Sequence, residues 1–571
     1  KLWNEKAVSA GTTVKMTSTG ADIKNDTTVT AGTTLTQDAH TTLTNTGAVQ
    51  ATGIDQDAGS TITNSSTVTA TTGAIDQDAA GKINNVGVVK AGTTIDMTST
   101  GADIQNDANV TAGTGITMGA STAIDNSNSN LTVSSTSGGI SLTAGTDIKN
   151  DIVNAGGAVS MDTVTNNGTT IENTGAVTAG GTLTEKAKTT LTNSAAVKAA
   201  TGITMEAGNS ISNGSTVEAT GGSIGMTATN NGITNTGAVT ATGESSSVSM
   251  SATNTSAGAI QNDANVTAGN GITMTAGTTI DNSNNSLLVS SAKGGISLTA
   301  GTSITNDAVT ASAGSVSMTA NKGNITNNGA LQALGTSSTV NLTAKDSSAG
   351  AITNNANVTA GNGITMTADT AIDNSNSSLV VSSTSGDITL TAGTSITNDA
   401  VTANAGSVSM TATNNGITNN GAVQAIGDNS SVSMTATNTD AGAISNSDIV
   451  SAGKDVTETA GTTLTNTGAV TATAGAIDQD AVGKIWNKLA VDGKTTVDMT
   501  STGDAIQNDT TVKAGTTLTQ NAYTSLTNTG AVQAATGITI NAGTSISNGS
   551  TVEATGGSIS MTATDKGITN T

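Results

Sequence analysis

Hydrophobic and polar positions repeat along the whole chain in one short pattern. An aliphatic residue stands two positions before an asparagine, first at Leu2 and Asn4 and last at Ile568 and Asn570. The pattern occurs 27 times, at steps of 19 to 27 residues. A period of this length is typical of solenoid proteins, in which each repeat is one turn stacked on the next.

Alternation with a period of two fills the rest of each repeat. One stretch places its apolar or ladder residues at Val266, Ala268, Ile272, Met274, Ile280 and Asn282. The residues between them, Thr267, Thr273 and Asp281, are expected to face solvent, and Gly269, Gly271 and Gly277 to mark the corners. The pattern predicts an all-β chain: a right-handed parallel β-helix of about 27 coils, each with three short strands.

The recurring asparagine is interpreted as a structural element. Stacked asparagine side chains can hydrogen-bond to one another, and asparagine tolerates the left-handed backbone of a sharp corner. The predicted structural asparagine ladder includes Asn4, Asn25, Asn45, Asn64, Asn85, Asn106, Asn126, Asn282, Asn374, Asn466 and Asn487.

Larger repeats are superimposed on the coils. Residues 260–351 and 352–443 are duplicated 92-residue blocks, and a 483-residue repeat relates Trp3 to Trp486 and His40 to Tyr523. We therefore expect residues 1–571 to form a single continuous repeat array, a window of a longer protein. Longer coils are expected to bulge at their corners, as at 243–246.

Composition narrows the possible functions. The net charge is −22 and the chain contains no proline, cysteine or phenylalanine. Arginine is also absent, which argues against nucleic-acid partners, and no apolar run is long enough for a membrane span. The lone histidine, His40, cannot build a zinc site or a Ser-His-Asp triad. We predict no catalytic, metal or cofactor site and no enzyme activity.

Some outward residues are candidate contacts. Trp3 and Trp486 lie between inward positions, so their indoles are expected to point outward, either to meet a partner or to pack against neighbouring lysines. Tyr523 is expected at a corner. Acidic pairs in the sequence I-D-Q-D, such as Asp55 and Asp57, are interpreted as solvated corner charge, with weak calcium binding as the alternative.

The stretches 461–473 (GTTLTNTGAVTAT) and 477–481 (IDQDA) resemble the β-helical repeats of the filamentous haemagglutinin family. The resemblance covers the whole chain and concerns the style of the repeat. It implies a shaft that is extracellular, on the cell surface of a bacterium with an outer membrane, exported by two-partner secretion and serving adhesion, aggregation or biofilm contact. The implied partners are further repeats or copies of the chain, and surface glycans or proteins.

Two alternatives stay open at this stage. In the first alternative, the outward threonines of the T-x-T segments form a surface that binds ice or glycans, although Asp, Ser and Lys interrupt these rows. A polysaccharide-cleaving β-helix enzyme is the second, and the absence of arginine argues against it.

Overall fold

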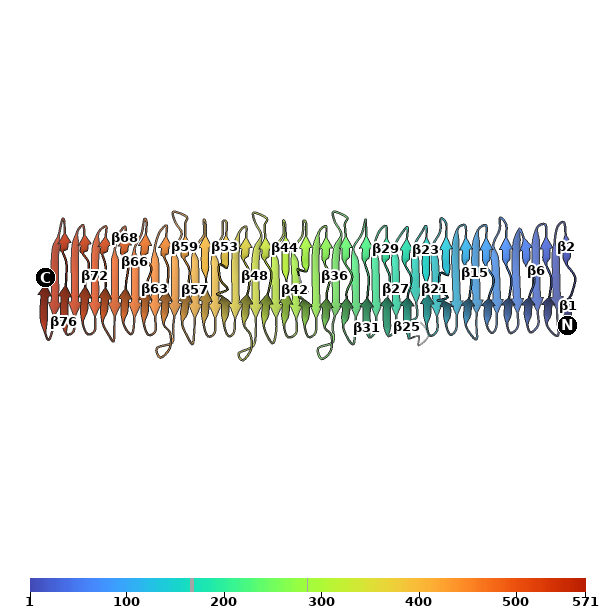
Figure 1. The fold of residues 1–571 in the computed structure, drawn as a ribbon, viewed down its shortest axis with the longest axis horizontal. Coiled ribbons are helices and arrows are strands. Elements are labelled where there is room, and N and C mark those ends of the chain that lie inside the picture. The colour runs from blue at the N-terminus through green and yellow to red at the C-terminus, as the bar shows by residue number, and fades with distance from the viewer. Residues whose placement is uncertain (165–168, 285) are drawn as a thin grey trace. The chain divides into compact units, whose positions relative to one another are not determined.

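The computed structural model describes residues 1–164, 169–284 and 286–571, and all regular structure among them is β-strand. The chain divides into two compact units, Lys1–Thr278 and Thr279–Thr571. The first unit contains the strands from β1 (Leu2–Asn4) to β39 (Gly271–Ala276), and the second those from β40 (Ile280–Asn282) to β79 (Gly567–Asn570). Figure 1 shows the strands in chain order.

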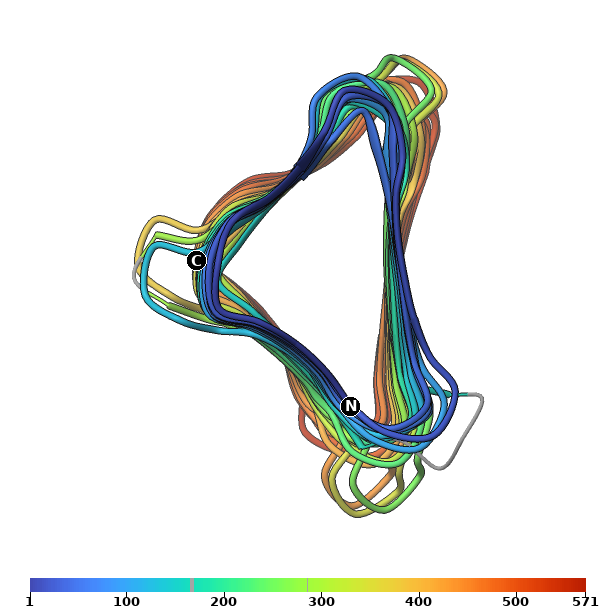
Figure 2. The same cartoon turned by 90° about the vertical axis from the view of Figure 1, so that its right-hand side faces the viewer.

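Each coil consists of three strands, one for each of three parallel sheets. In the coil that starts at Ile62 these are β10 (Ile62–Asn64), β11 (Val68–Ala70) and β12 (Ile75–Ala79). Within each unit the coils follow a three-sided path (Figure 2). The predicted β-solenoid, with three strands per coil, is confirmed.

Strands of the first sheet begin at the aliphatic residue or one position earlier, and end at the ladder asparagine. Strands of the second sheet hold three or four residues, and those of the third hold four to six. Equivalent strands of consecutive coils pair in parallel without slippage, so that Ile62 lies beside Ile83 and Asn64 beside Asn85. A shift by one residue would turn every inward side chain outward, so the buried face holds this register.

The core of each unit is a thin column of small and medium aliphatic side chains. In β12 the pattern of burial alternates residue by residue, and Ile75 and Ala79 are buried while Asp76 and Asp78 are exposed. The three inward pairs expected at 266–282 are buried, as predicted. Each coil covers the apolar side chains of the next, as stacked repeats require.

Corners differ from coil to coil. The long coil of the first unit has a turn at 243–246 between β35 (Val239–Ala241) and β36 (Ser247–Ala252), and a second excursion at 253–259 before β37 (Ile260–Asn262). Loops of this kind project beyond the strands in Figure 1. The bulge expected at 243–246 is present, although Ser246 itself is buried. Gly271, expected at a corner, instead begins β39.

Backbone conformation corrects one expectation about the ladder. Ladder asparagines do not adopt the left-handed conformation, because they are the last residues of extended strands. Among the described residues, the non-glycine residues with positive φ are Asn130, Ser286, Asp346 and Ser378. Corner glycines are needed because there is no room for a side chain: a Cβ atom added to Gly138 would lie 1.3 Å from the Thr114 carbonyl oxygen.

Candidate functional site

The ladder asparagines hydrogen-bond from coil to coil inside each unit. In the first unit, the side-chain amide of Asn25 donates to the Asn45 Oδ1 at 2.7 Å, and Asn45 donates in turn to Asn64 at 2.8 Å. In the second unit Asn374 donates to Asn398 at 2.8 Å. The other predicted members of the ladder that donate in the same way to the asparagine of the following coil are Asn4, Asn64, Asn85, Asn106, Asn126, Asn282, Asn466 and Asn487. The ladder thereby gives hydrogen-bond partners to side-chain amides that would otherwise be buried without them.

A second polar column lies beside the ladder and was not predicted from the sequence. The middle inward position of the third-sheet strand, often methionine, is glutamine at Gln37, Gln56, Gln77, Gln479 and Gln520. Gln37 Nε2 donates to Asn45 Oδ1 at 2.9 Å, and Asn45 Nδ2 donates back to Gln37 Oε1 at 3.1 Å. Gln56 also donates to Gln37 at 2.8 Å. The signal was present in I-D-Q-D, where the glutamine alternates with the two aspartates.

Two glutamates occupy this same inward position. Glu185 on β27 (Leu183–Ala187) and Glu458 on β63 (Val456–Ala460) are both fully buried. Burial raises the pKa of each carboxyl to about 7, against the opposing effect of the asparagine amides that donate to it. These are the two acidic side chains buried among the described residues.

The two tryptophans lie on the outer surface, each in contact with lysines. Lys484 and Lys488 place their ammonium groups 4.5 and 4.3 Å from the centre of the Trp486 ring. The Trp486 indole N–H donates to Asp509 at 2.8 Å. Trp3 repeats the arrangement with Lys24 at 5.0 Å and an indole N–H bond to Asp26 of 2.6 Å. Both indoles therefore pack against lysine side chains, which was one of the two arrangements expected from the sequence.

His40 and Tyr523 stand at corresponding corners of the two units. His40 follows β6 (Thr34–Ala39) and Tyr523 follows β72 (Thr517–Ala522). Both are exposed, Tyr523 to 65%. The structure places neither of them beside Trp3 or Trp486 along a strand, so the candidate contact residues form no common site within either unit.

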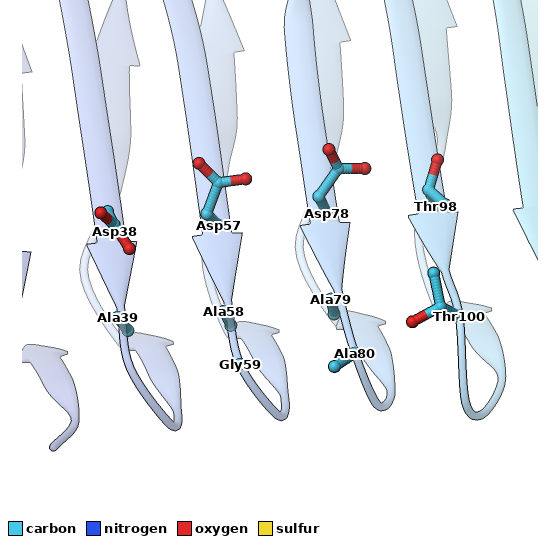
Figure 3. Close-up of a pocket in the computed structure, with 10 residues that line it drawn as sticks. All are labelled: Asp38, Ala39, Asp57, Ala58, Gly59, Asp78, Ala79, Ala80, Thr98 and Thr100. Carbon is cyan, nitrogen blue, oxygen red and sulfur yellow. The ribbon is translucent and has the colours of Figure 1, made fainter. Parts of the chain in front are cut away.

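Six aspartates, four of them from I-D-Q-D segments, line part of the outer face of the third sheet in the first unit. They lie on strands and not at corners, which corrects the sequence interpretation. Pairing of β6, β9 (Gly53–Ala58), β12 and β15 (Thr94–Ser99) builds two columns. The columns are Asp38, Asp57, Asp78 and Asp55, Asp76, Asp96. We call these six residues the acidic face, and Figure 3 shows the first column beside a shallow hollow.

Several carboxyl groups of the acidic face have raised pKa values. Burial, and then the charges of neighbouring aspartates, raise the pKa of Asp76 to about 6. The pKa values of Asp55, Asp57 and Asp96 are also raised, by burial first. Among the described residues, no group of three or more acidic, histidine or cysteine side chains is arranged to hold a metal ion.

In the second unit, part of the same face carries hydroxyl groups instead. Eight consecutive third-sheet strands, from β42 (Ile296–Ala300) to β63, place threonine at one outward position, in register. The column comprises Thr299, Thr319, Thr343, Thr367, Thr391, Thr411, Thr435 and Thr459. The neighbouring outward column holds Ser, Thr and one Asn. We call this two-column surface the hydroxyl face. Of the interruptions expected from the sequence, serine falls within it, and aspartate follows directly, because both columns continue in register into Asp478 and Asp480 on β66 (Ile477–Ala481).

Comparisons with protein-family models, curated proteins and solved structures returned no match for this chain. In residues 1–164, 169–284 and 286–571, there is no helix with the length and apolar character that crossing a membrane requires. The three sheets of stacked strands fit a structural repeat protein of the β-solenoid type.

Proposed function

We propose that the chain is the structural shaft of a secreted or cell-surface bacterial filament or adhesin, with a role in adhesion, aggregation or cell–cell contact in biofilms. The observation that carries this proposal is the interior of each unit. Most inward positions are occupied by aliphatic or methionine side chains and by amides that bond to the next coil, so the interior serves stacking. In this proposal the chain is not an enzyme.

Resistance to extension is the property that such a shaft needs. Pulling along the stack would separate whole coils, each joined to its neighbours by three short strands and a ladder hydrogen bond. Stability in stacked repeats is approximately the sum of such neighbour terms. Many similar interfaces in series would therefore yield one after another, and a single weak coil would not release the whole chain.

Cells that produce the protein provide the test. Immunogold labelling of intact cells is expected to mark the outer surface, and deletion of the repeat array is expected to reduce autoaggregation and biofilm mass. Retention of the protein inside intact, protease-treated cells would contradict the surface role. Unchanged aggregation in the deletion strain would contradict the role in cell contact.

The hydroxyl face favours a second candidate function, the binding of ice. Strands about 4.8 Å apart, with outward residues about 6.6 Å apart along each strand, would present a regular net of hydroxyl and methyl groups. The face carries no charged side chain at either outward position. A regular, uncharged surface is suited to an ordered water lattice, whereas the acidic face of the first unit is not.

An ice-recrystallisation assay separates the two candidates. If the hydroxyl face binds ice, Thr391→Lys will abolish inhibition of crystal growth while leaving the fold intact. The matched control is Thr98→Lys, on β15 of the first unit and beside Asp78 of the acidic face, which should leave inhibition unchanged. A wild-type chain without inhibition would remove this candidate and leave the shaft.

A further inference from the structure

One ionisable group lies inside each unit, at a position where other coils use glutamine. Glu185 belongs to the first unit and Glu458 to the second, and neither side chain is accessible to solvent. Each precedes a ladder asparagine by eight residues, Asn193 and Asn466, as Gln37 precedes Asn45. The pairs of glutamine and asparagine show which hydrogen bonds a side chain at this position makes.

At the glutamine positions the two side chains bond in both directions. Asn64 Nδ2 donates to Gln56 Oε1 at 3.1 Å while Gln56 Nε2 donates to Asn64 Oδ1 at 3.3 Å. A carboxylate accepts hydrogen bonds but cannot donate one. A protonated carboxyl has an O–H group and therefore matches glutamine in both shape and hydrogen-bonding capacity.

Around Glu185 the ladder is interrupted. Asn173 and Asn193 donate to its two carboxyl oxygens at 2.8 and 2.9 Å. The Asn193 amide is directed to Glu185 and to the sulfur of Met205, and the buried Asn213 Oδ1 accepts no hydrogen bond from the described residues. A buried acceptor without a donor is costly, so this coil is a weak point of the first unit.

Around Glu458 the ladder is continuous. Asn446 donates to one carboxyl oxygen at 2.7 Å, and Asn466 and Gln479 donate to the other at 2.9 and 2.7 Å. Asn466 also donates to Asn487 at 3.0 Å, so the next coil remains connected. Glu458 therefore has one more donor than Glu185.

We propose that Glu185 and Glu458 are pH-sensitive positions of the interior: protonated, each replaces a glutamine, and ionised, each destabilises the stack in its own unit. This device is independent of what the surface binds. It would make the coils around each glutamate open more readily in alkaline than in mildly acidic surroundings.

Among the described residues, no buried counter-ion offsets either carboxylate. Paired strands place Met161 and Met205 beside Glu185, and Met434 and Gln479 beside Glu458. Inward residues of the adjoining first- and second-sheet strands are aliphatic or asparagine. The charged side chains on the elements packed around the two glutamates face outward or lie at corners, and they are Asp162, Glu172, Lys186, Lys188, Glu206, Lys454, Asp455, Asp478 and Asp480.

The direction of the pH effect follows from the raised pKa values. Each folded-state pKa lies near 7, above the ordinary value of 4.5, so the folded chain holds a proton that the unfolded chain has lost. The stabilisation is complete below pH 4.5 and is lost as the pH rises through about 7.

Hydrogen exchange on the full chain tests the proposal with Glu458→Gln. Glutamine is the natural residue at this place in the next coil, at Gln479, so the variant keeps the fold. The ratio of wild-type to variant protection in β63 should fall by up to about tenfold per pH unit between the two pKa values. Because both proteins are compared at each pH, the intrinsic pH dependence of exchange cancels. A constant ratio from pH 4.5 to pH 8 would overturn the proposal.

Direct titration of the wild type provides a second, independent readout. The carbon-13 resonances of the two buried carboxyls should titrate near pH 7, and Glu458→Gln and Glu185→Gln should each remove one of them. Titration of both groups near 4.5 would overturn the proposal, whatever the variants do.

Discussion

Part of the third sheet in the first unit presents the acidic face, and part of it in the second unit presents the hydroxyl face, over the same kind of interior. Beneath Asp76 the strand buries Ile75, Gln77 and Ala79, and beneath Thr389 and Thr391 the strand β54 (Ile388–Ala392) buries Ile388, Leu390 and Ala392. Parallel pairing continues in register under both faces. The difference shows that the inward positions determine the fold, while the outward positions are free to acquire chemistry.

The largest expected effect comes from the interior, and it should be large under both faces. Asn64→Ala in the first unit and Asn398→Ala in the second each remove two ladder hydrogen bonds, and Asn64→Ala also removes the pair of bonds with Gln56. Each should lower the local free energy of unfolding by about 2–4 kcal/mol, measured by native-state hydrogen exchange. The outward neighbours provide controls, since Thr63→Ala and Thr397→Ala should change it by less than about 0.5 kcal/mol.

A large loss beneath one face and none beneath the other would break the comparison. It would mean that the outer face contributes to the stability of the coil beneath it. Large losses in both variants would show that the ladder supports both kinds of outer face.

The next effect concerns the acidic face and its dependence on pH. The raised pKa of Asp76, near 6, means that its contribution to stability is present below the ordinary value of 3.8 and is lost as the pH rises through about 6. Asp76→Asn should therefore stabilise the first unit at pH 8, by several tenths of a kcal/mol because solvent and salt screen the repulsion. Denaturant titration of the two proteins measures the difference.

Two controls sharpen this prediction. Thr117→Asn, on β18 (Gly115–Ala120), lies in the column of Asp76 and Asp96 but removes no charge, so it should have no pH-dependent effect. High salt should reduce the gain from Asp76→Asn. A gain that persists in 1 M salt would show that repulsion between aspartates is not its cause.

The smallest effect is expected from transferring acidic residues to the hydroxyl face. Thr391→Asp alone should leave the second unit folded with little change in stability. Adding Thr367→Asp in the neighbouring coil places two carboxylates in register, as in the acidic face. The carboxyl pKa values of the double variant, measured by carbon-13 resonance, should exceed that of the single variant. Equal values would show that register alone does not reproduce the acidic face.

Much of the fold was predictable because one short pattern carries it. Aliphatic-x-Asn and the period-two alternation fix which residues face inward, and the strands end where that pattern ends. The ladder could be assigned for the same reason, since every coil has an asparagine equivalent to Asn64, two residues after the aliphatic residue. The left-handed conformation expected of these asparagines was wrong, because strand pairing extends to the asparagine itself.

The rest depended on how coils stack. The sequence suggested a surface of outward threonines but not its location or extent, because members such as Thr367 and Thr391 are 24 residues apart and coil lengths vary. Only the pairing register shows that they are neighbours. The glutamine column and the buried Glu185 were missed because polar residues were expected to face outward, although alternation places them inside.

The most direct test of the central claim, a constant interior beneath variable faces, is peptide-resolved hydrogen exchange of the full chain at neutral pH. The account predicts equal, high protection in strands beneath the acidic face, such as β12, and beneath the hydroxyl face, such as β54, with fast exchange confined to corner excursions such as 253–259. Protection that followed the chemistry of the outer face, or uniformly fast exchange across these strands, would contradict it.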